Sequence, residues 1–273
     1  MKRAQRIAII TERLIFNPNT FFTLTSFSRE LEAAKSTLSE DIAIISDTLK
    51  QSGAGFVLTK QGIQGGVSYC PKYSPEKALK EVQAVCKTLN TPNRVLPGGF
   101  LYWSDILSNP AIIKKLARIV AGEFLNSGAD FVLTMETKGI PFAFMTAEAL
   151  GIPLVMARRM SKVYEGSAVS INYFTGSGSL ESMSLPKRAI KPGSTALIVD
   201  DFIKKGGTAL GMCTLMKEFD VQVAGMAFML SQNQQQRFIS GDISLMTLSR
   251  PSEAVPYVTP SSWLKDRVSE GEE

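Results

Sequence analysis

The chain has 273 residues, 44% of them hydrophobic, and it carries a formal net charge of +5. This length is sufficient for a sizeable core in one or two domains. The absence of histidine from the sequence excludes histidine-dependent catalytic triads, HExxH metalloproteases and histidine general bases. The basic charge balance permits a nucleic-acid partner but does not require one.

Cysteine usage and hydropathy indicate where the protein works. Cys70, Cys86 and Cys213 are far apart and form no CxxC pair, which favours isolated thiols in a reducing compartment over disulfides or a zinc site. No apolar run approaches the roughly 18 residues of a membrane span. The basic, then apolar, N-terminus is interrupted at residues 11–13, and no small-residue cleavage site follows. We therefore expect a cytoplasmic protein that does not contact a membrane.

The first third of the chain predicts three short helices. Apolar side chains recur at helical spacing over residues 7–14, and Asn-Pro-Asn at 17–19 ends that helix. A second helix is expected over residues 24–31. Ser36 is the predicted N-cap of a third helix, which ends at Ser-Gly 52–53, with glycine where a helix C-cap prefers it.

A β-hairpin is predicted next, from strands at 56–59 and 67–69 around a glycine-rich turn. Three helices and a hairpin are the order of a winged helix-turn-helix, whose third helix enters the DNA major groove. Short polar and basic side chains suited to phosphates and base edges make up the predicted DNA contacts: Lys2, Arg3, Arg6, Lys35, Ser36, Thr37, Ser39 and Lys60. The alternatives are an ordinary helical cap with solvated charges and a protein-interaction module.

Strand and helix patterns alternate after a predicted linker at 71–75. Helices are expected over 76–89, 112–125, 141–150 and 209–219, and strands over 131–134, 154–157, 196–199 and 223–230. Short apolar strands alternating with helices predict an α/β domain with a parallel sheet covered on both faces. We place a small α+β domain at residues 1–74 and this α/β domain at 75–273. The charged residues 265–273 are expected to fray.

An acidic pair and a glycine loop follow the strand expected at 196–199. Asp200 and Asp201 end that strand, and Gly206 and Gly207 then lead to Thr208 and a helix. The glycines let backbone N–H groups converge on an anion, and the helix N-terminus adds its positive end. Carboxylates accept hydrogen bonds from ribose hydroxyls. The segment therefore predicts a site for a phosphorylated ribose, in preference to a solvated acidic loop.

This segment resembles the phosphoribosyl-pyrophosphate motif of type I phosphoribosyltransferases. It has four apolar residues, two acids and a loop ending in glycines and threonine. In the resembling enzymes, the loop equivalent to Thr-Lys-Gly at 137–139 binds pyrophosphate, and Lys138 would be the charge partner here. The basic loop at 158–167, which leads into a predicted β-ribbon, takes the place of a mobile flap. The alternative for that loop is a solvated surface segment.

The whole pattern resembles the purine operon repressor family of Gram-positive bacteria, in which a winged helix is fused to a type I phosphoribosyltransferase-like domain. The resemblance is carried by residues 35–41, 96–102, 137–141, 165–173 and 199–208. It implies a homodimer that binds double-stranded operator DNA and senses phosphoribosyl pyrophosphate. The implied effector-binding residues are Asp200, Asp201, Phe202, Lys204, Lys205, Gly206, Gly207, Thr208, Thr137, Lys138, Gly139, Tyr102, Arg158 and Lys162.

The resemblance implies a sensor without catalytic residues. Active enzymes usually carry small residues at the positions of Lys204 and Lys205, and a fold does not by itself imply its usual reaction. No cofactor is required, and Mg²⁺ is expected to arrive with the ligand rather than at a dedicated site. Two alternatives remain: an active purine phosphoribosyltransferase with an accessory N-terminal domain, and an interaction module that binds no DNA.

Overall fold

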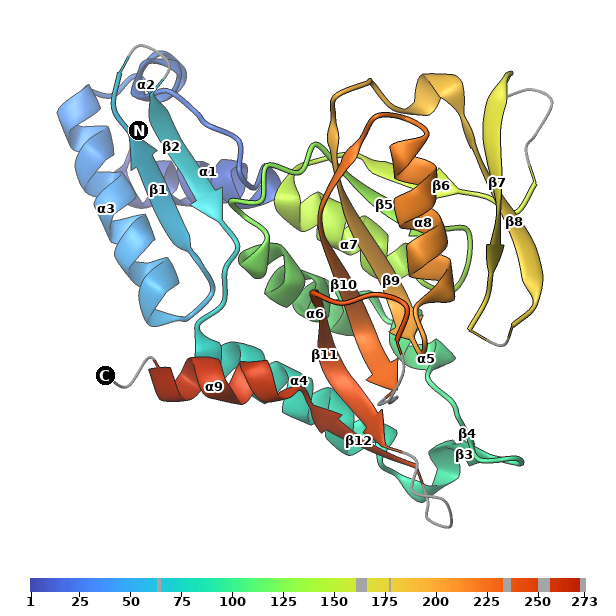
Figure 1. Ribbon diagram of the computed structural model, residues 1–273. Helices are drawn as coiled ribbons and strands as arrows, with labels where there is room; N and C mark the ends of the chain where they lie inside the picture. Colours follow the sequence, from blue (N-terminus) through green and yellow to red (C-terminus); the bar gives the residue numbers. More distant parts are fainter. Residues whose placement is uncertain (63–64, 161–165, 177, 233–236, 250–255, 271–273) are drawn as a thin grey trace.

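The computed structural model describes residues 1–62, 65–160, 166–176, 178–232, 237–249 and 256–270. Its N-terminal part consists of α1 (Arg3–Phe16), α2 (Leu24–Leu31), α3 (Lys35–Gln51) and the antiparallel hairpin β1 (Phe56–Lys60) and β2 (Gly66–Cys70) (Figure 1). The winged-helix order is confirmed. The predicted cap of α3 is wrong by two residues, because Ala34 is the N-cap and its carbonyl accepts the N–H of Leu38.

A small separate core holds these elements together. Alternating apolar positions of all three helices meet the hairpin around Leu14, Phe27, Leu38 and Tyr69, which are fully or almost fully buried. The Tyr69 hydroxyl donates to the Ala54 carbonyl at 2.7 Å, so the polar end of this large side chain is also satisfied. The hairpin is therefore fixed to the helices.

The second part is built on a six-stranded sheet in the order β12-β11-β10-β9-β5-β6. Its strands are β5 (Phe131–Met135), β6 (Leu154–Ala157), β9 (Thr195–Ile203), β10 (Gln222–Gln232), β11 (Asp242–Ser249) and β12 (Tyr257–Pro260). All neighbours pair in parallel except the edge strand β12, which is antiparallel to β11. The predicted parallel sheet is confirmed.

Helices cover both faces of this sheet, as the apolar strands require. One face packs against α4 (Pro75–Leu89), α6 (Pro110–Glu123), α7 (Ile140–Leu150) and α9 (Ser262–Glu270). The other face packs against α8 (Gly207–Lys217) and the ribbon of β7 (Ala168–Phe174) and β8 (Leu180–Pro186). A small hairpin, β3 (Val95–Leu96) and β4 (Phe100–Leu101), and the one-turn helix α5 (Ser104–Leu107) precede α6. No helix in the described part of the chain is long and apolar enough to cross a membrane.

Two expectations are corrected. Strand β9 does not end before the acidic pair but continues to Ile203, because β10 lies beside it and pairs Phe228 with Asp200. Residues 265–270 are helical rather than frayed. The helix α9 packs on α4, Leu264 is buried, and Trp263 donates its indole N–H to the Ser244 carbonyl at 2.8 Å.

Candidate functional site

The acidic pair lies in the last part of β9 and is nearly removed from solvent. Asp200 is 6% exposed and Asp201 is 8% exposed. The Asp201 amide N–H donates to Asp200 Oδ1 at 2.9 Å. Burial, and then the neighbouring Asp201 charge, raise the pKa of Asp200 well above its ordinary value. Burial also raises the pKa of Asp201. Two desolvated carboxylates are costly to a fold, which is typical of a binding site.

Side chains from two other segments contact the pair. Thr137 hydrogen-bonds to Asp200, and Trp103 hydrogen-bonds to Asp201. The Trp103 ring also lies 5.2 Å, centroid to centroid, from the ring of Phe202. The positive charge of Lys138 lowers the pKa of Asp201, against the larger effect of burial. The residue before α5 and the loop before α7 therefore both converge on β9.

The loop at 137–139 touches the acidic pair directly. A Cβ atom added to Gly139 would overlap Asp200 Oδ1 and would lie 2.9 Å from the Asp201 amide nitrogen. Only glycine allows this close approach. The structure thus brings together two of the predicted segments, which are separated by about sixty positions in the sequence.

The glycine loop forms a cavity beside the acids. It has a volume of about 140 Å³ and is lined by Gly176, Asp200, residues 202–209 and Phe228. Gly206, with a φ of +87°, is the N-cap of α8, so the first amides of this helix face the cavity end of the loop. Phe238 donates its backbone N–H to the Lys205 carbonyl at 2.8 Å, which fixes the loop from the far side. The chemistry of this cavity suits a phosphate group.

Two predicted effector contacts lie apart from that cavity. Tyr102 is 43% exposed, its ring lies 6.0 Å from the guanidinium carbon of Arg94, and it is not among the cavity's lining residues. Arg158 exchanges backbone hydrogen bonds with Ser184, and its Nε lies 3.9 Å from Glu136 Oε1. A contact of Tyr102 or Arg158 with the effector stays a prediction. The prediction for Lys162 falls outside the described residues.

Trp103 is a site residue that sequence reasoning missed. The sequence feature that points to Trp103 is the aromatic-rich segment at 100–103, in which the sequence prediction names only Tyr102 as an effector contact. The structure shows that Trp103, rather than its neighbour, faces the acidic pair. No local pattern distinguishes two adjacent aromatic residues by the strand that each will contact.

A second candidate site lies between the wing and the helices. A groove of about 530 Å³ runs between the hairpin and the N-terminal ends of α2 and α3. Lys35 and Lys60 both line it, with threonine hydroxyls at Thr23, Thr25 and Thr59. The exposed Ser36 and Ser39 follow on the free face of α3. A polar groove with cations on two sides suits a DNA backbone.

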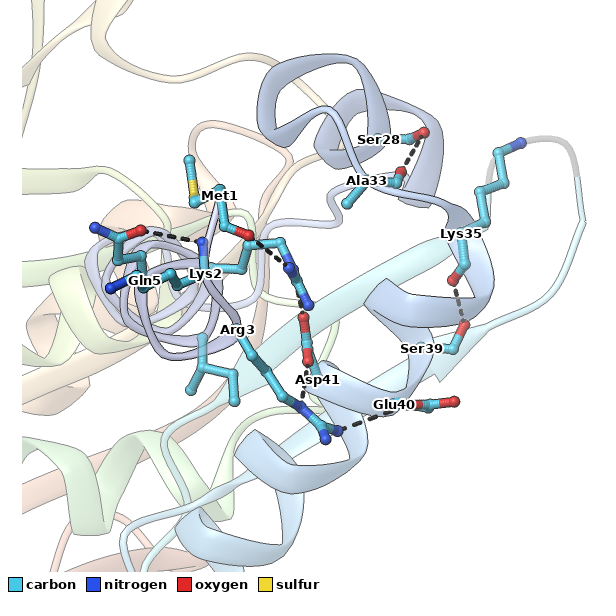
Figure 2. A network of polar contacts seen from close by, with 12 residues as sticks. Met1, Lys2, Arg3, Gln5, Ser28, Ala33, Lys35, Ser39, Glu40 and Asp41 are labelled. Atoms are coloured by element: carbon cyan, nitrogen blue, oxygen red, sulfur yellow. Dashed lines mark hydrogen bonds and ion pairs between the residues drawn. The ribbon is translucent and has the colours of Figure 1, made fainter.

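Two N-terminal arginines pair with acids of α3, and Figure 2 shows Arg3 beside Glu40 and Asp41. Asp41 of α3 is fully buried, and its two carboxylate oxygens accept from Arg6 Nε at 2.8 Å and Arg3 Nε at 3.0 Å. The Arg6 side chain is only 12% exposed. The prediction that Arg6 contacts phosphate is therefore corrected, because a buried carboxylate requires its cation. Arg3 is 53% exposed and also lies 3.7 Å from Glu40.

The remaining predicted DNA contacts lie nearby. Lys2 is the exposed N-cap of α1, and its backbone N–H donates to Gln5 Oε1 at 3.1 Å. Thr37 is half-buried in the first turn of α3. The Lys60 ammonium lies 4.6 Å from the centroid of the Phe21 ring, a cation–π contact that orients it on the wing.

These features define the class of the protein as a winged helix-turn-helix joined to a phosphoribosyltransferase-type domain. Family models match both parts. Residues 2–71 match "Bacterial purine repressor, N-terminal", and residues 102–255 match "Phosphoribosyl transferase domain". The two matches lie on the two cores seen in the structure.

Curated relatives extend over nearly the whole chain. It is 42% identical to the purine biosynthesis transcriptional repressor PurR of Bacillus subtilis (strain 168), over 91% of this chain and 88% of that protein. It is 40% identical to the purine biosynthesis transcriptional activator PurR of Lactococcus lactis subsp. lactis, over 92% and 93%. A xanthine phosphoribosyltransferase of Lactococcus lactis subsp. cremoris is 25% identical over 59% of this chain and 86% of its own length. The chain belongs to the bacterial purine repressor family, as its sequence motifs predict.

Proposed function

We propose that this protein is a DNA-binding transcriptional regulator of purine genes and that phosphoribosyl pyrophosphate is its effector. The observation that carries the proposal is the presence, in one chain, of a basic winged-helix groove and a buried acidic pair beside an anion loop. Relatives named as a transcriptional repressor and as an activator of purine biosynthesis support the first half of the proposal.

The chemistry of the second site supports the choice of effector. Asp200 and Asp201 are hydrogen-bond acceptors for the two ribose hydroxyls. The amides of residues 206–208 and the N-terminal end of α8 suit the 5′-phosphate. Lys138, whose charge acts on Asp201, would supply the cation that a pyrophosphate needs. One ligand class, a ribose phosphorylated at both ends, uses all three elements.

Mg²⁺ fits this site when the ligand carries it. A cation beside Asp200 and Asp201 would offset the burial that raises the pKa of both, and so would favour their ionised forms. Mg²⁺ prefers substrate phosphates with one or two carboxylates. Within the described residues, no group of three or more acidic, cysteine or histidine side chains gathers to hold a metal by itself. Asp200 and Asp201 would hold the ion, which would supply positive charge to offset the negative charge of the pyrophosphate.

The direct test is a DNA-binding titration on the chain's own upstream purine-gene region, with and without phosphoribosyl pyrophosphate and Mg²⁺. The wild-type affinity should change, and the double variant Asp200→Ala/Asp201→Ala should lose that change while keeping its basal DNA affinity. Glu218→Ala, which removes an exposed acid at the other end of α8, is the matched control. Collapse of basal DNA binding in the double variant would assign the acids a structural role instead.

Ligand binding can be followed separately from DNA binding. The chain has two tryptophans, and Trp103 hydrogen-bonds to Asp201. In a Trp263→Phe background, phosphoribosyl pyrophosphate should change the intrinsic fluorescence in a saturable way. The acidic-pair variant should show no such change. A flat titration in the parent protein would count against the effector site.

We propose that the site binds without transferring the ribosyl group. Lys204 and Lys205 occupy the loop positions where active enzymes usually carry small residues, and the fused DNA-binding part gives the domain another use. The competing function is purine salvage, which the phosphoribosyltransferase fold itself favours. Incubation with phosphoribosyl pyrophosphate, Mg²⁺ and each purine base distinguishes the two. We expect no pyrophosphate release, whereas turnover near an ordinary enzyme rate of roughly 1–1000 s⁻¹ would favour salvage.

The family resemblance also implies a homodimer. Two winged helices related by a two-fold axis would bind two operator half-sites, so the spacing of those half-sites would reflect the symmetry of the protein.

A further inference from the structure

Helix α7 lies between the two candidate sites. Figure 1 shows it between the N-terminal part and strand β9. Its N-terminus follows the loop at 137–139, and its C-terminus ends at Gly151, which adopts the left-handed conformation at φ +70°. At about 1.5 Å per residue, its 11 residues span roughly 16 Å.

The N-terminal end of α7 is in closest contact with the acidic pair. Gly139, its N-cap, leaves no room for even a methyl group against Asp200 Oδ1 and the Asp201 amide. Thr137, two residues earlier, hydrogen-bonds to Asp200. Because close-packed atoms cannot be compressed, any displacement of Asp200 or of the loop must move the end of the helix.

The C-terminal end of α7 is attached to the winged helix. Asn19 donates from Nδ2 to the Ala149 carbonyl at 3.0 Å, which satisfies one of the last carbonyls of the helix. A Cβ atom added to Gly151 would lie 2.5 Å from the Pro18 carbonyl oxygen. Asn19 also donates its backbone N–H to the Tyr69 carbonyl of β2 at 2.9 Å. One residue thus connects α7 to a strand of the wing.

Between these ends α7 behaves as one rigid body. Six of its residues are buried, and five of them, among them Phe142, Ala147 and Leu150, belong to the main core together with α6 and β9. Such a helix transmits a small shift at one end to the other rather than absorbing it. Asn19 itself has a φ of +58°, a left-handed conformation that asparagine adopts more readily than most residues other than glycine.

We infer that α7 couples the effector site to the winged helix and that Asn19 is the positioning residue through which the shift reaches β2. The inference rests on the proposed function, because it needs an effector that changes DNA affinity. Movement of the 137–139 loop and the acidic pair on ligand binding displaces α7. The Asn19–Ala149 hydrogen bond and the Gly151–Pro18 contact then shift the winged helix, as one unit, relative to the effector domain.

The test uses Asn19→Gly, which removes the amide donor and tolerates the positive φ. The measured quantity is the coupling ratio, the DNA dissociation constant with phosphoribosyl pyrophosphate divided by that without it. We expect the coupling ratio of the variant to be closer to one than that of the wild type by a factor of at least about three. This factor corresponds to the loss of one net hydrogen bond. The dissociation constant for phosphoribosyl pyrophosphate alone, followed by Trp103 fluorescence, should stay within about twofold of wild type.

The matched control is Lys77→Gln. Lys77 Nζ donates to the Ser52 carbonyl at 2.9 Å, which joins α4 to the end of α3 without involving α7. Its coupling ratio should equal that of the wild type. Asn19→Asp, which keeps the side-chain shape but removes the donor, should reproduce Asn19→Gly and serves if the glycine variant is unstable.

The outcomes separate two failures. A wild-type protein whose DNA affinity ignores phosphoribosyl pyrophosphate overturns the proposed function, and with it the coupling. A responsive wild type with unchanged ratios in both Asn19 variants overturns the role of α7 alone. An equal loss of coupling in Lys77→Gln also overturns it, since the effect would then belong to the domain contact in general.

Discussion

Asp200 and Asp201 are consecutive in a buried strand, and both are carboxylates that the fold desolvates. Burial and the Asp201 charge place the pKa of Asp200 well above its ordinary value of 3.8. At a pH between the ordinary pKa of Asp200 in the unfolded chain and its raised pKa in the folded protein, the folded protein binds more protons than the unfolded chain. Its stability therefore falls as pH rises through that window. At neutral pH the pair costs stability that a bound ligand or cation would restore.

Replacing Asp200 with Asn tests this cost. The amide keeps an oxygen for the Asp201 N–H, so we expect higher stability than wild type at pH 7.5 and a smaller difference near pH 4. A gain of about 1 kcal/mol would raise Tm by roughly 2–4 °C. Thermal unfolding at both pH values measures it, with the exposed Asp266→Asn as control. A destabilisation that is larger at pH 7.5 than near pH 4 would mean that the ionised carboxylate is stabilising in the folded state.

At the scale of elements, the wing and α3 enclose a groove, and the charges in it have different roles. Lys35 and Lys60 line the groove, whereas Arg6 is held by the buried Asp41. The first two cations are available to a phosphate backbone and the third stabilises the packing of α1 on α3. The net charge of the chain does not show which cations are free to bind DNA and which are paired within the fold.

Lys60→Gln should weaken DNA binding mainly through lost counterion release. The slope of log K against log salt concentration should become less steep by about 0.9, the value of one phosphate contact. Lys50→Gln removes an equal charge from the opposite end of α3 and should leave the slope unchanged. Equal slopes for wild type and Lys60→Gln would place the wing tip off the DNA.

At the scale of the whole molecule, two sites on one chain must obey thermodynamic linkage. If phosphoribosyl pyrophosphate changes DNA affinity by some factor, DNA must change effector affinity by the same factor and in the same sense. Effector titrations with and without saturating operator DNA, followed by Trp103 fluorescence, should therefore reproduce the factor from the DNA titrations. Such couplings are typically about 5–150-fold. Unequal factors would show that a second binding event contributes.

Much of the fold could be predicted because its elements are locally encoded. Apolar spacing placed the helices of the winged-helix part, and apolar runs placed β5, β6, β9 and β10 to within a few residues. Strands β11 and β12 at the sheet edge were not predicted. They form because β11 pairs with β10 and β12 pairs with β11. The acidic pair, its glycine loop and the Thr-Lys-Gly segment were all identified, since each is a contiguous motif next to a strand.

The two-part architecture, the family and the chemistry of the motif around Asp200 could be predicted, because these depend on short-range patterns. The contacts of Trp103 with Asp201, of Arg6 with Asp41 and of Asn19 with the end of α7 became known only from the folded structure. Each of these contacts joins residues between 35 and 130 positions apart. Such pairings are set by how the helices and strands pack, and no local pattern records which side chains packing will bring together.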